Sequence, residues 1–410
     1  MQLPHLLRGL ALAIATVVLT ACAHTPTQPA VSRPLTILVS IDGFRADYLD
    51  RGVTPVLSGL AAHGARAAMR PSFPSKTFPN HYTLVTGLRP DHHGIVENNM
   101  EDPAIPGVVF KMSNAQAVVD RRWWDQGEPL WVTAEKAGIR TATMFWPGSE
   151  APIRGVRPSL FLHFNQAVLA PARADQILAW LDLPAEARPK FVTLYFDDVD
   201  TFGHQFGPDS PEVNAAAGRV DAALGRLIDG LKAREIEANL VVVADHGMAQ
   251  LSPDRRLVIE DLVPGNAIRI LSGGAFMTLY PVPGHEQEVE RLLVGRHDHL
   301  SCWKKGHFPE RFHYGKNPRV AAIFCLPDTG WTINNRGYKA GWPELGTHGF
   351  DPYSPEMAAV FVASGPAFKP GVKLPTFDNV DVYPLLANLI GVKPQPNDGH
   401  LGPVRGALAR

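Results

Sequence analysis

The stretch LTILVSIDG, residues 35–43, decides the fold class of this chain. Its first seven residues are mostly apolar or β-branched, which predicts a strand buried on both faces, as in a parallel sheet. The strand ends at Asp42, and the glycine that follows favours a turn. Three further segments have the same apolar character, at residues 191–196, 240–244 and 357–364.

Segments with the apolar spacing of helices separate these strands, so we predict an α/β fold with a mostly parallel sheet and helices on both faces. The segment 266–345 departs from this alternation, with a predicted strand at 275–280, a helix near 285–294 and many Gly, Pro and aromatic residues. We interpret it as an inserted α+β subdomain that divides the core into residues 35–265 and 346–410. The predicted helices of the core cover residues 54–63, 130–138, 173–182, about 211–235 and 379–391.

The composition is that of a globular protein with a sizeable core. Of the 410 residues, 45% are hydrophobic and 19% are charged, which excludes disorder over most of the chain. The 39 Lys and Arg residues nearly balance the 40 Asp and Glu residues, so the surface is not built to bind duplex nucleic acid. A small anionic substrate is compatible with this balance, and we predict no protein partner.

The N-terminus has the pattern of an export signal, with an apolar run at 10–19 that is too short to span a membrane. The run ends in Leu-Thr-Ala before Cys22, which resembles a bacterial lipobox, so we expect a signal peptide over 1–21 and a lipid on Cys22. The alternative is an ordinary cleavage site beside a free cysteine. Ala23 favours the outer membrane over the inner one, and residues 22–34 predict a flexible tether. We therefore expect a periplasm-facing lipoprotein of a bacterial cell envelope, attached to the membrane only through this lipid.

Two further cysteines, Cys302 and Cys325, lie in the predicted subdomain. In an oxidising compartment they could form a disulfide, and the alternative is two buried thiols. No Cys-x-x-Cys spacing occurs, so any bound metal must be held by oxygen and nitrogen ligands.

Carboxylates follow three of the predicted strands: Asp42, Asp245 and, after a short extension, Asp200. The carboxyl ends of parallel strands meet at one edge of the sheet, where ligands bind in open α/β folds. Aspartate also closes strands in ordinary turns, but three of them at one edge favour a functional site.

Three histidines accompany these carboxylates. His204 lies four residues after Asp200, and His246 directly follows Asp245. His348 is the histidine of the Gly-Thr-His-Gly segment at 346–349. Each histidine alone is more often a satisfied polar residue than a ligand. Together the set suits borderline cations such as Zn²⁺, and it has enough ligands for the two ions that phosphoryl hydrolysis uses.

A nucleophile is available in Thr77, which we expect at or near the N-terminus of a short helix that ends near residue 86. Backbone N–H groups and the helix dipole favour an oxyanion there, and metal coordination can generate a threonine alkoxide at neutral pH. The alternative is a helix cap that contributes about 1 kcal/mol to stability.

Six motifs carry these residues: VSIDGFR (39–45), KTFPNHY (76–82), FWPGSE (145–150), DTFGHQFGP (200–208), VADHGM (243–248) and HG (348–349). In this order they resemble the nucleotide pyrophosphatase/phosphodiesterase family of the alkaline phosphatase superfamily. The resemblance spans residues 35 to about 395, is nearest to the compact bacterial members, and implies an alkaline-phosphatase-like core.

By position, the resemblance implies two Zn²⁺ ions. One would be bound by Asp200, His204 and His348, and the other by Asp42, Thr77, Asp245 and His246. It also implies that Thr77 attacks phosphorus and forms a covalent intermediate, which water then hydrolyses.

The resemblance implies substrate contacts as well. Asn98 would hydrogen-bond a non-bridging phosphate oxygen together with the Thr77 backbone N–H, and the neighbouring Asn99 is a second candidate. Phe78 and Tyr195 would stack on the nucleobase, although Tyr195 lies in an apolar strand and could simply belong to the core.

The chain departs from the family's pattern before its fourth motif. Asp197 and Asp198 replace the Glu-Glu-Pro run that is common in animal members before the metal aspartate. Asp197 is therefore an alternative to Asp200, although the spacing to His204 favours Asp200.

We thus expect a two-zinc phosphodiesterase that hydrolyses phosphodiester and pyrophosphate bonds of nucleotides to 5′-monophosphates. A phosphomonoesterase is an alternative, because Lys76 beside the nucleophile could meet the additional phosphate charge. A phosphodiesterase for lipid head groups is another. A non-catalytic, metal-binding envelope lipoprotein is the third, but it leaves the intact nucleophile and ligand set unexplained.

Overall fold

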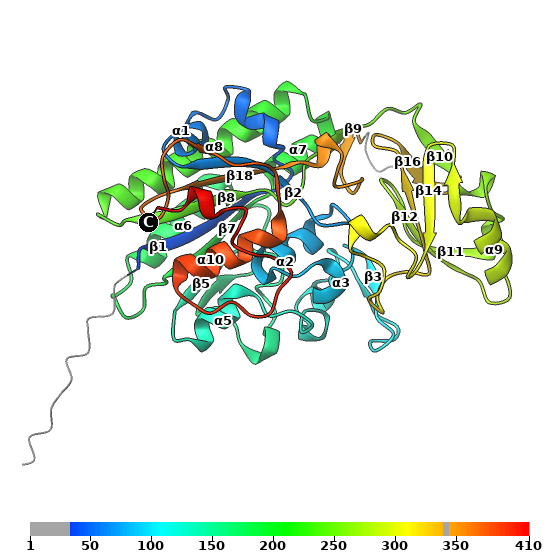
Figure 1. Cartoon of the computed structure of the whole chain (residues 1–410), viewed down its shortest axis with the longest axis horizontal. Coiled ribbons are helices and arrows are strands. Elements are labelled where there is room, and N and C mark those ends of the chain that lie inside the picture. The colour runs from blue at the N-terminus through cyan, green and yellow to red at the C-terminus, as the bar shows by residue number, and fades with distance from the viewer. Residues whose placement is uncertain (1–32, 339–343, 410) are drawn as a thin grey trace, which may run out of the picture. The chain divides into compact units, whose positions relative to one another are not determined.

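A nine-stranded sheet is the centre of the computed structural model, which describes residues 33–338 and 344–409 (Figure 1). Eight strands follow the order β19-β2-β18-β8-β1-β7-β5-β6, and β20 pairs with β2 outside this path. Their bounds are β1 Leu35–Ile41, β2 Ala65–Arg70, β5 Thr141–Met144, β6 Leu160–Leu162, β7 Phe191–Phe196, β8 Ala238–Val243, β18 Ala359–Ser364, β19 Val372–Lys373 and β20 Phe377–Asp378.

The strand β1 lies between β7 and β8 and is parallel to both. Ser40 near its end is opposite Tyr195 on one side and Val243 on the other. The residues that follow these three strands therefore meet at one edge of the sheet, as the sequence predicts.

The sheet is mostly parallel, as predicted, and one strand departs from this direction. The strand β18 is apolar like its neighbours, but it runs antiparallel to β8 and to β2. The chain reaches β18 from beside the end of β8, where the Gly247 N–H donates to the Met357 carbonyl. It therefore enters the sheet at the edge where β8 leaves it. An apolar run indicates burial on both faces of a strand and carries no information about its direction.

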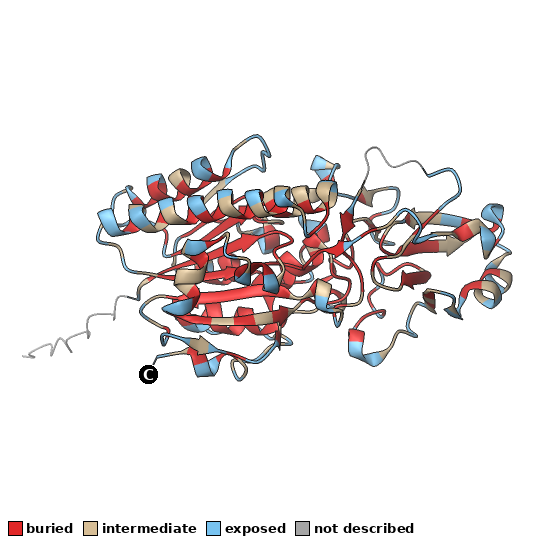
Figure 2. Ribbon diagram, turned by 90° about the horizontal axis from the view of Figure 1, so that it is seen from above, coloured by how far each residue is buried: buried red, intermediate tan, exposed pale blue. Residues whose placement is uncertain are grey.

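Helices cover both faces of the sheet, as predicted (Figure 1). On one face α8 packs against α1, α6 and α7, and on the other α10 packs against α2, α5 and β1. Figure 2 shows buried residues concentrated in the strands, whereas α8 alternates buried and exposed residues along its length, as an amphipathic surface helix does. The bounds are α1 Pro55–Ala62, α2 Thr77–Thr86, α5 Leu130–Lys136, α6 Ala170–Leu181, α7 Asp198–Phe206, α8 Pro211–Ala233 and α10 Val382–Ile390. The shorter elements of the described residues are α3 Pro90–His93, α4 Ala115–Val118, β3 Met100–Glu101, β4 Val109–Phe110, β9 Ala249–Gln250, β10 Arg256–Val258, β16 Thr332–Asn334 and β17 Gly346–Thr347.

A second, antiparallel sheet lies within the segment interpreted as a subdomain, with the strand order β11-β12-β15-β14-β13. It has a separate hydrophobic cluster that includes Leu279, Val289 and Leu300. The predicted strand and helix correspond to β12 and α9, and residues 266–345 remain our interpretation of the subdomain's bounds. The elements are β11 Ile268–Ser272, β12 Met277–Pro281, α9 Glu286–Leu293, β13 Gly295–His297, β14 Leu300–Lys304 and β15 Ile323–Pro327.

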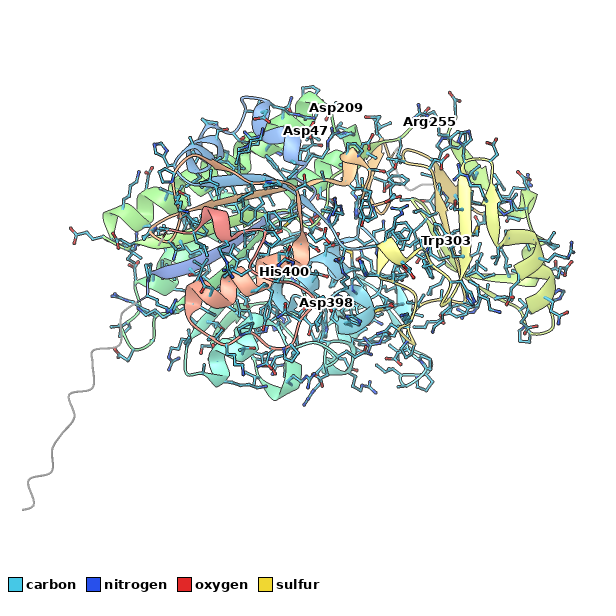
Figure 3. All side chains as sticks on the ribbon, viewed as in Figure 1. Asp47, Asp209, Arg255, Trp303, Asp398 and His400 are labelled. Carbon is cyan, nitrogen blue, oxygen red and sulfur yellow. A yellow bond between two sulfur atoms is a disulfide. The ribbon has the colours of Figure 1, made fainter. Side chains whose placement is uncertain are left out.

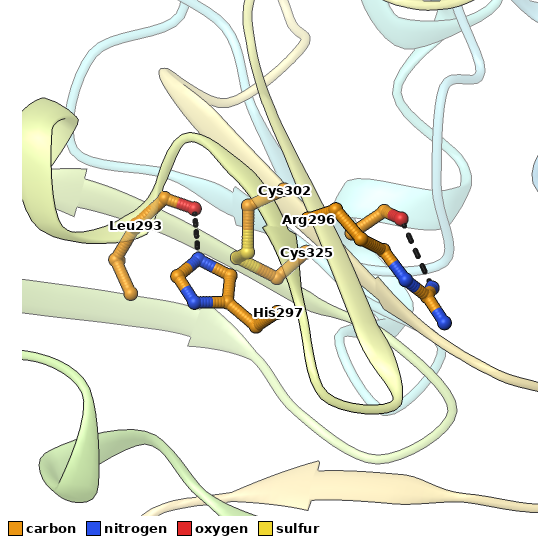
Figure 4. Close-up of a disulfide and its surroundings, with 6 residues drawn as sticks. Leu293, Arg296, His297, Cys302 and Cys325 are labelled. Carbon is orange, nitrogen blue, oxygen red and sulfur yellow. Dashed lines mark hydrogen bonds between the residues drawn. A yellow bond between two sulfur atoms is a disulfide. The ribbon is translucent and has the colours of Figure 1, made fainter.

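The two cysteines of this sheet form a disulfide (Figure 4). Cys302 on β14 is directly opposite Cys325 on β15, with their Cα atoms 4.0 Å apart. Of the two alternatives that the sequence leaves open, the structure therefore shows the disulfide.

An aromatic cluster joins the second sheet to the segment before α2. Trp303 on β14 (Figure 3) packs against Phe308 and Phe312, with ring centroids 5.7 Å from each. Phe312 in turn stacks on Phe73 at 4.3 Å. Because Phe73 lies four residues before Thr77, this cluster fixes the approach to the N-terminus of α2.

The predicted signal peptide at 1–21, Cys22 and most of the predicted tether lie outside the described residues. Within residues 33–338 and 344–409, the helices are too short or too polar to span a bilayer.

Candidate active site

The structure brings the three predicted carboxylates together at the sheet edge. Asp42 follows β1, Asp245 follows β8, and Asp200 lies in the first turn of α7, directly after β7. Gly43 has φ +67°, and a Cβ atom there would lie 3.0 Å from the Cα of Asp200. A glycine at this position therefore allows the end of β1 to approach α7 closely.

Each of these carboxylates has a buried oxygen that the protein leaves without a hydrogen-bond partner. The Tyr195 hydroxyl donates to Asp42 Oδ2 at 2.6 Å, and the Gly43 N–H donates to Asp245 Oδ1 at 3.2 Å. Among the described residues, Asp42 Oδ1, Asp200 Oδ1 and Asp245 Oδ2 accept no hydrogen bond. Buried carboxylate oxygens are costly unless they bind a donor or a cation, so this set fits a metal centre.

The histidines present their Nε2 atoms to the same centre. The Nδ1 atoms of His204, His246 and His348 each lie 2.9 Å from a backbone carbonyl, those of Gly346, Gly247 and Ser75 respectively. A carbonyl only accepts hydrogen bonds, so Nδ1 carries a proton, and in the neutral form of the ring the lone pair is on Nε2. This is the usual second contact of a metal-binding histidine.

Distances within the cluster do not by themselves divide it into two ion sites. His246 Nε2 is 2.8 Å from Asp245 Oδ2 and 3.4 Å from Asp42 Oδ1, yet its ring also stacks on His348 at 3.5 Å. Proximity groups His246 with Asp200 and His348. The division into two ligand sets therefore rests on the resemblance to the family.

The electrostatics of the site also fit a cation. Burial, together with the nearby Asp245 and Asp200 carboxylates, raises the pKa of Asp42 well above its usual range. Burial, with His246 and Lys76 nearby, lowers the pKa of His348 well below its usual value, so this ring is neutral, as a ligand must be. A divalent ion would relieve the repulsion among the carboxylates.

Asp197, the alternative to Asp200, is engaged elsewhere. Its carboxylate lies 2.7 Å from the guanidinium of the buried Arg173. Asp200, in contrast, has one oxygen 3.5 Å from His204 Nε2 and the other 3.7 Å from His348 Nε2. The structure thus brings Asp200 into the cluster.

Thr77 is the first residue of α2, and Lys76 is the N-cap. The threonine hydroxyl therefore does not cap the helix, and it lies 3.3 Å from His246 Nε2. The Phe78 N–H donates to Asn98 Oδ1 at 3.0 Å, whereas the described residues accept no hydrogen bond from the Thr77 N–H. This leaves an N–H at the positive end of the helix available to an anion.

The segment before Thr77 is held by a side chain of the same motif. Asn80 Oδ1 accepts from the Ser72 N–H, and its Nδ2 donates to the carbonyls of Pro74 and Lys76. These bonds fix the turn that carries the nucleophile candidate.

His81 is a residue of the site that sequence reasoning missed. It lies 3.5 Å from Asp245 Oδ2, but its Nδ1 donates to the Thr77 carbonyl and its Nε2 accepts from the Ser40 hydroxyl. With both ring nitrogens engaged, His81 orients Thr77 and Asp245. The sequence feature that could have identified His81 is its place in the KTFPNHY motif, four residues after Thr77.

An apolar pocket of about 140 Å³ opens beside Thr77. Phe78 and Tyr195 both line it, but Tyr195 is only 7% exposed and its hydroxyl is bonded to Asp42. Phe164, which is 47% exposed, also lines the pocket, and its ring packs edge-on against that of Tyr195. Sequence reasoning missed Phe164, an isolated aromatic residue without a motif or periodicity around it.

Asn98 is fixed beside the nucleophile candidate through its bond to the Phe78 N–H. Its amide nitrogen, 3.6 Å from the Met112 sulfur, makes only a weak contact and can still donate. Asn99, the second candidate, lines a neighbouring polar pocket with Asn98.

Comparison with known proteins identifies relatives of this chain. Residues 36–351 match the family model described as type I phosphodiesterase / nucleotide pyrophosphatase. The chain is 40% identical over 385 residues to an uncharacterized pyrophosphatase/phosphodiesterase of Schizosaccharomyces pombe, covering 88% of this chain and 78% of the relative. It is 37% identical over 401 residues to human ectonucleotide pyrophosphatase/phosphodiesterase family member 1, covering 94% of this chain.

Among solved structures, murine ectonucleotide pyrophosphatase/phosphodiesterase 5 matches with a TM-score of 0.86 and 33% identity, over 92% of this chain and 100% of that one. That structure is an inactive threonine-to-alanine variant in complex with AMP. The chain spans 43% of the human relative and 45% of a venom phosphodiesterase from Macrovipera lebetinus. From its sequence and its fold, the chain belongs to the type I phosphodiesterase / nucleotide pyrophosphatase family of the alkaline phosphatase superfamily.

Proposed function

We propose that the chain is a two-zinc phosphodiesterase that hydrolyses phosphodiester and pyrophosphate bonds of nucleotides to 5′-monophosphates, with Thr77 as the nucleophile. The observation that carries this proposal is the position of Thr77. Its hydroxyl lies at a helix N-terminus, 3.3 Å from His246 Nε2, among buried carboxylates with unpaired oxygens. A relative of 33% identity is inactive as a threonine-to-alanine variant.

The residues of the cluster would hold two ions. Asp200, His204 and His348 would bind one, and Asp42, Thr77, Asp245 and His246 the other. Bound there, zinc would neutralise phosphate charge and lower the pKa of the threonine hydroxyl and of water.

The reaction then requires two displacements at phosphorus. The Thr77 hydroxyl gives up its proton to solvent, and Oγ1 forms a bond to phosphorus while the bond to the leaving-group oxygen breaks. That oxygen departs with the electron pair. The amide of Asn98 and the Thr77 N–H donate to the oxygen that gains charge, as an oxyanion hole does. Water then attacks the phosphothreonine, releases the nucleoside 5′-monophosphate and restores the hydroxyl.

The apolar pocket supports a nucleotide as the group that is retained on phosphorus. Phe78 and Phe164 offer aromatic faces beside Thr77, and a stacked base contributes about 1–3 kcal/mol. A monoester carries more charge at phosphorus, and neither lysine nor arginine occurs among the described residues that line this pocket. Both observations favour nucleotide diesters over monoesters.

A substrate panel on the purified protein tests the proposal. We expect nucleoside 5′-nitrophenyl esters and dinucleoside polyphosphates to be hydrolysed faster than glycerophosphocholine-type diesters and monoesters. A monoester hydrolysed faster than every diester would overturn the assignment, and a preferred lipid head-group diester would redirect it to that class.

We also propose that a lipid on Cys22 anchors the protein in a bacterial envelope, where it faces the periplasm. The anchoring membrane in this proposal is the outer membrane in preference to the inner one. The lipobox-like sequence supports the anchor, and the disulfide between Cys302 and Cys325 supports an oxidising compartment. Cys22→Ser should release the protein from membranes in cell fractionation. A variant that stays membrane-bound would contradict the lipid anchor.

A further inference from the structure

A second pocket, of about 280 Å³, adjoins the candidate active site. Thr77 lines the apolar pocket, its neighbours Lys76 and Asn98 line the second one, and Met112 lines both. The proposed function requires that the apolar pocket holds the nucleoside. The leaving group of the substrate would then occupy this second pocket.

Two lysines give the leaving-group pocket positive charge. The Lys76 ammonium lies 5.3 Å from the centre of the Phe276 ring, and no carboxylate of the described residues forms an ion pair with it. A Cβ atom at Gly349 would lie 2.8 Å from Lys76 Cε, so the glycine makes room for this side chain. Lys111 is exposed at the same pocket.

Glu97 is the carboxylate that lines this pocket, and it is 4% exposed. The Ser272 hydroxyl, at the end of β11, donates to Glu97 Oε2 at 2.7 Å. Burial raises the pKa of Glu97 to about 7, although the Ser272 bond and Lys76 act in the opposite direction. The charged and titratable groups around it are Lys76, Lys111, Tyr280 and Tyr314, and beyond them the ion pair of Arg269 with Glu101.

We propose that Glu97 sets the charge preference of the leaving-group pocket: its carboxylate disfavours polyanionic leaving groups, and its protonated form admits them. With both lysines charged, ionised Glu97 leaves the pocket one net positive charge, and protonation leaves two. A polyphosphate leaving group gains most from that difference, whereas a nitrophenolate gains little.

Two substrates with the same nucleoside test this specificity role. One is the nucleoside 5′-nitrophenyl ester and the other a dinucleoside tetraphosphate, chosen because it lacks a terminal phosphate with its own second pKa of about 6. In the ratio of their kcat/KM values, the effects of any group of the enzyme that titrates and acts equally on both substrates cancel. For the wild-type protein this ratio of tetraphosphate to ester should fall about tenfold as pH rises from about 6 to about 8.

The variant Glu97→Gln should keep the ratio high and independent of pH. Glu101→Gln removes the same charge from the same segment, but at a half-buried position outside the pocket lining and paired with Arg269, so its ratio should follow the wild type. A wild-type ratio that is flat with pH, or a Glu97→Gln ratio that still falls, would overturn the inference. A flat wild-type profile would overturn the inference even if the variant does not fold. Failure of the proposed function would look different, since a monoester or a lipid head-group diester would then be hydrolysed faster than both of these substrates.

Discussion

The Tyr195 hydroxyl offers a test of the metal centre that spares the ligands themselves. It donates to Asp42 Oδ2 at 2.6 Å, and Asp42 is only 2% exposed. A hydrogen bond to a charged group contributes about 1.5–3 kcal/mol. Loss of such a partner from a metal ligand typically costs about 10–100-fold in metal affinity. Tyr195→Phe should therefore raise the free zinc concentration for half-maximal activity by about 10–100-fold.

The assay is activity on a nucleoside nitrophenyl ester in zinc buffers set by a chelator. Because Phe keeps the ring, stacking in the apolar pocket is preserved, and KM at saturating zinc should change little. Tyr48→Phe is the matched control. The Tyr48 hydroxyl is also buried but has no hydrogen-bond partner among the described residues, so its removal should leave zinc affinity unchanged.

Two results would refute this reasoning. Wild-type zinc affinity in Tyr195→Phe would mean that the hydroxyl does not support the metal-binding carboxylate. An increase in KM at unchanged zinc affinity would mean that the hydroxyl contacts the nucleotide instead.

Three further predictions follow from the site and the core. Elemental analysis should find two zinc ions per active wild-type chain, chelation should abolish activity, and His348→Ala should weaken one ion far more than the other; active protein without a transition metal would contradict this. Phe78→Ala and Phe164→Ala should cost nucleotide esters about 1–3 kcal/mol more than a small aryl diester, and equal losses on both substrates would argue against a nucleobase pocket. Burial lowers the pKa of His93 from 6.5 to about 3, so only the unfolded state binds its proton in that range. Stability should be complete above pH 6.5 and fall at lower pH by at most about 1.4 kcal/mol per pH unit. His93→Gln should flatten this slope in denaturant unfolding, and an unchanged slope would contradict the assignment.

Much of the fold could be predicted from local sequence patterns. The segments around β1, β7 and β8 are apolar runs that end at polar residues, so their burial and their shared edge follow from residue types alone. The start of α2 near Thr77 could likewise be predicted, because Gly87 marks the end of a short helix that begins there.

Other features depend on pairings that no local pattern encodes. The direction of β18 depends on where the chain re-enters the sheet after residue 345. The bond from Tyr195 to Asp42 depends on register, because Tyr195 is opposite Ser40 and Asp42 lies two residues after Ser40, just beyond the end of β1. Phe164 reaches the apolar pocket through a loop after β6 that has no periodic pattern.

The identity of the nucleophile is the central claim, and trapping the covalent intermediate tests it most directly. Purified protein mixed with a nucleoside nitrophenyl ester would be quenched in acid within one turnover and digested for mass spectrometry. The account predicts a nucleoside phosphate adduct on Thr77 of the wild-type protein. Thr77→Ala should form no adduct and lose several orders of magnitude in turnover, whereas Thr77→Ser should keep substantial activity. Hydrolysis by Thr77→Ala at near the wild-type rate, without an adduct in the wild type, would contradict it.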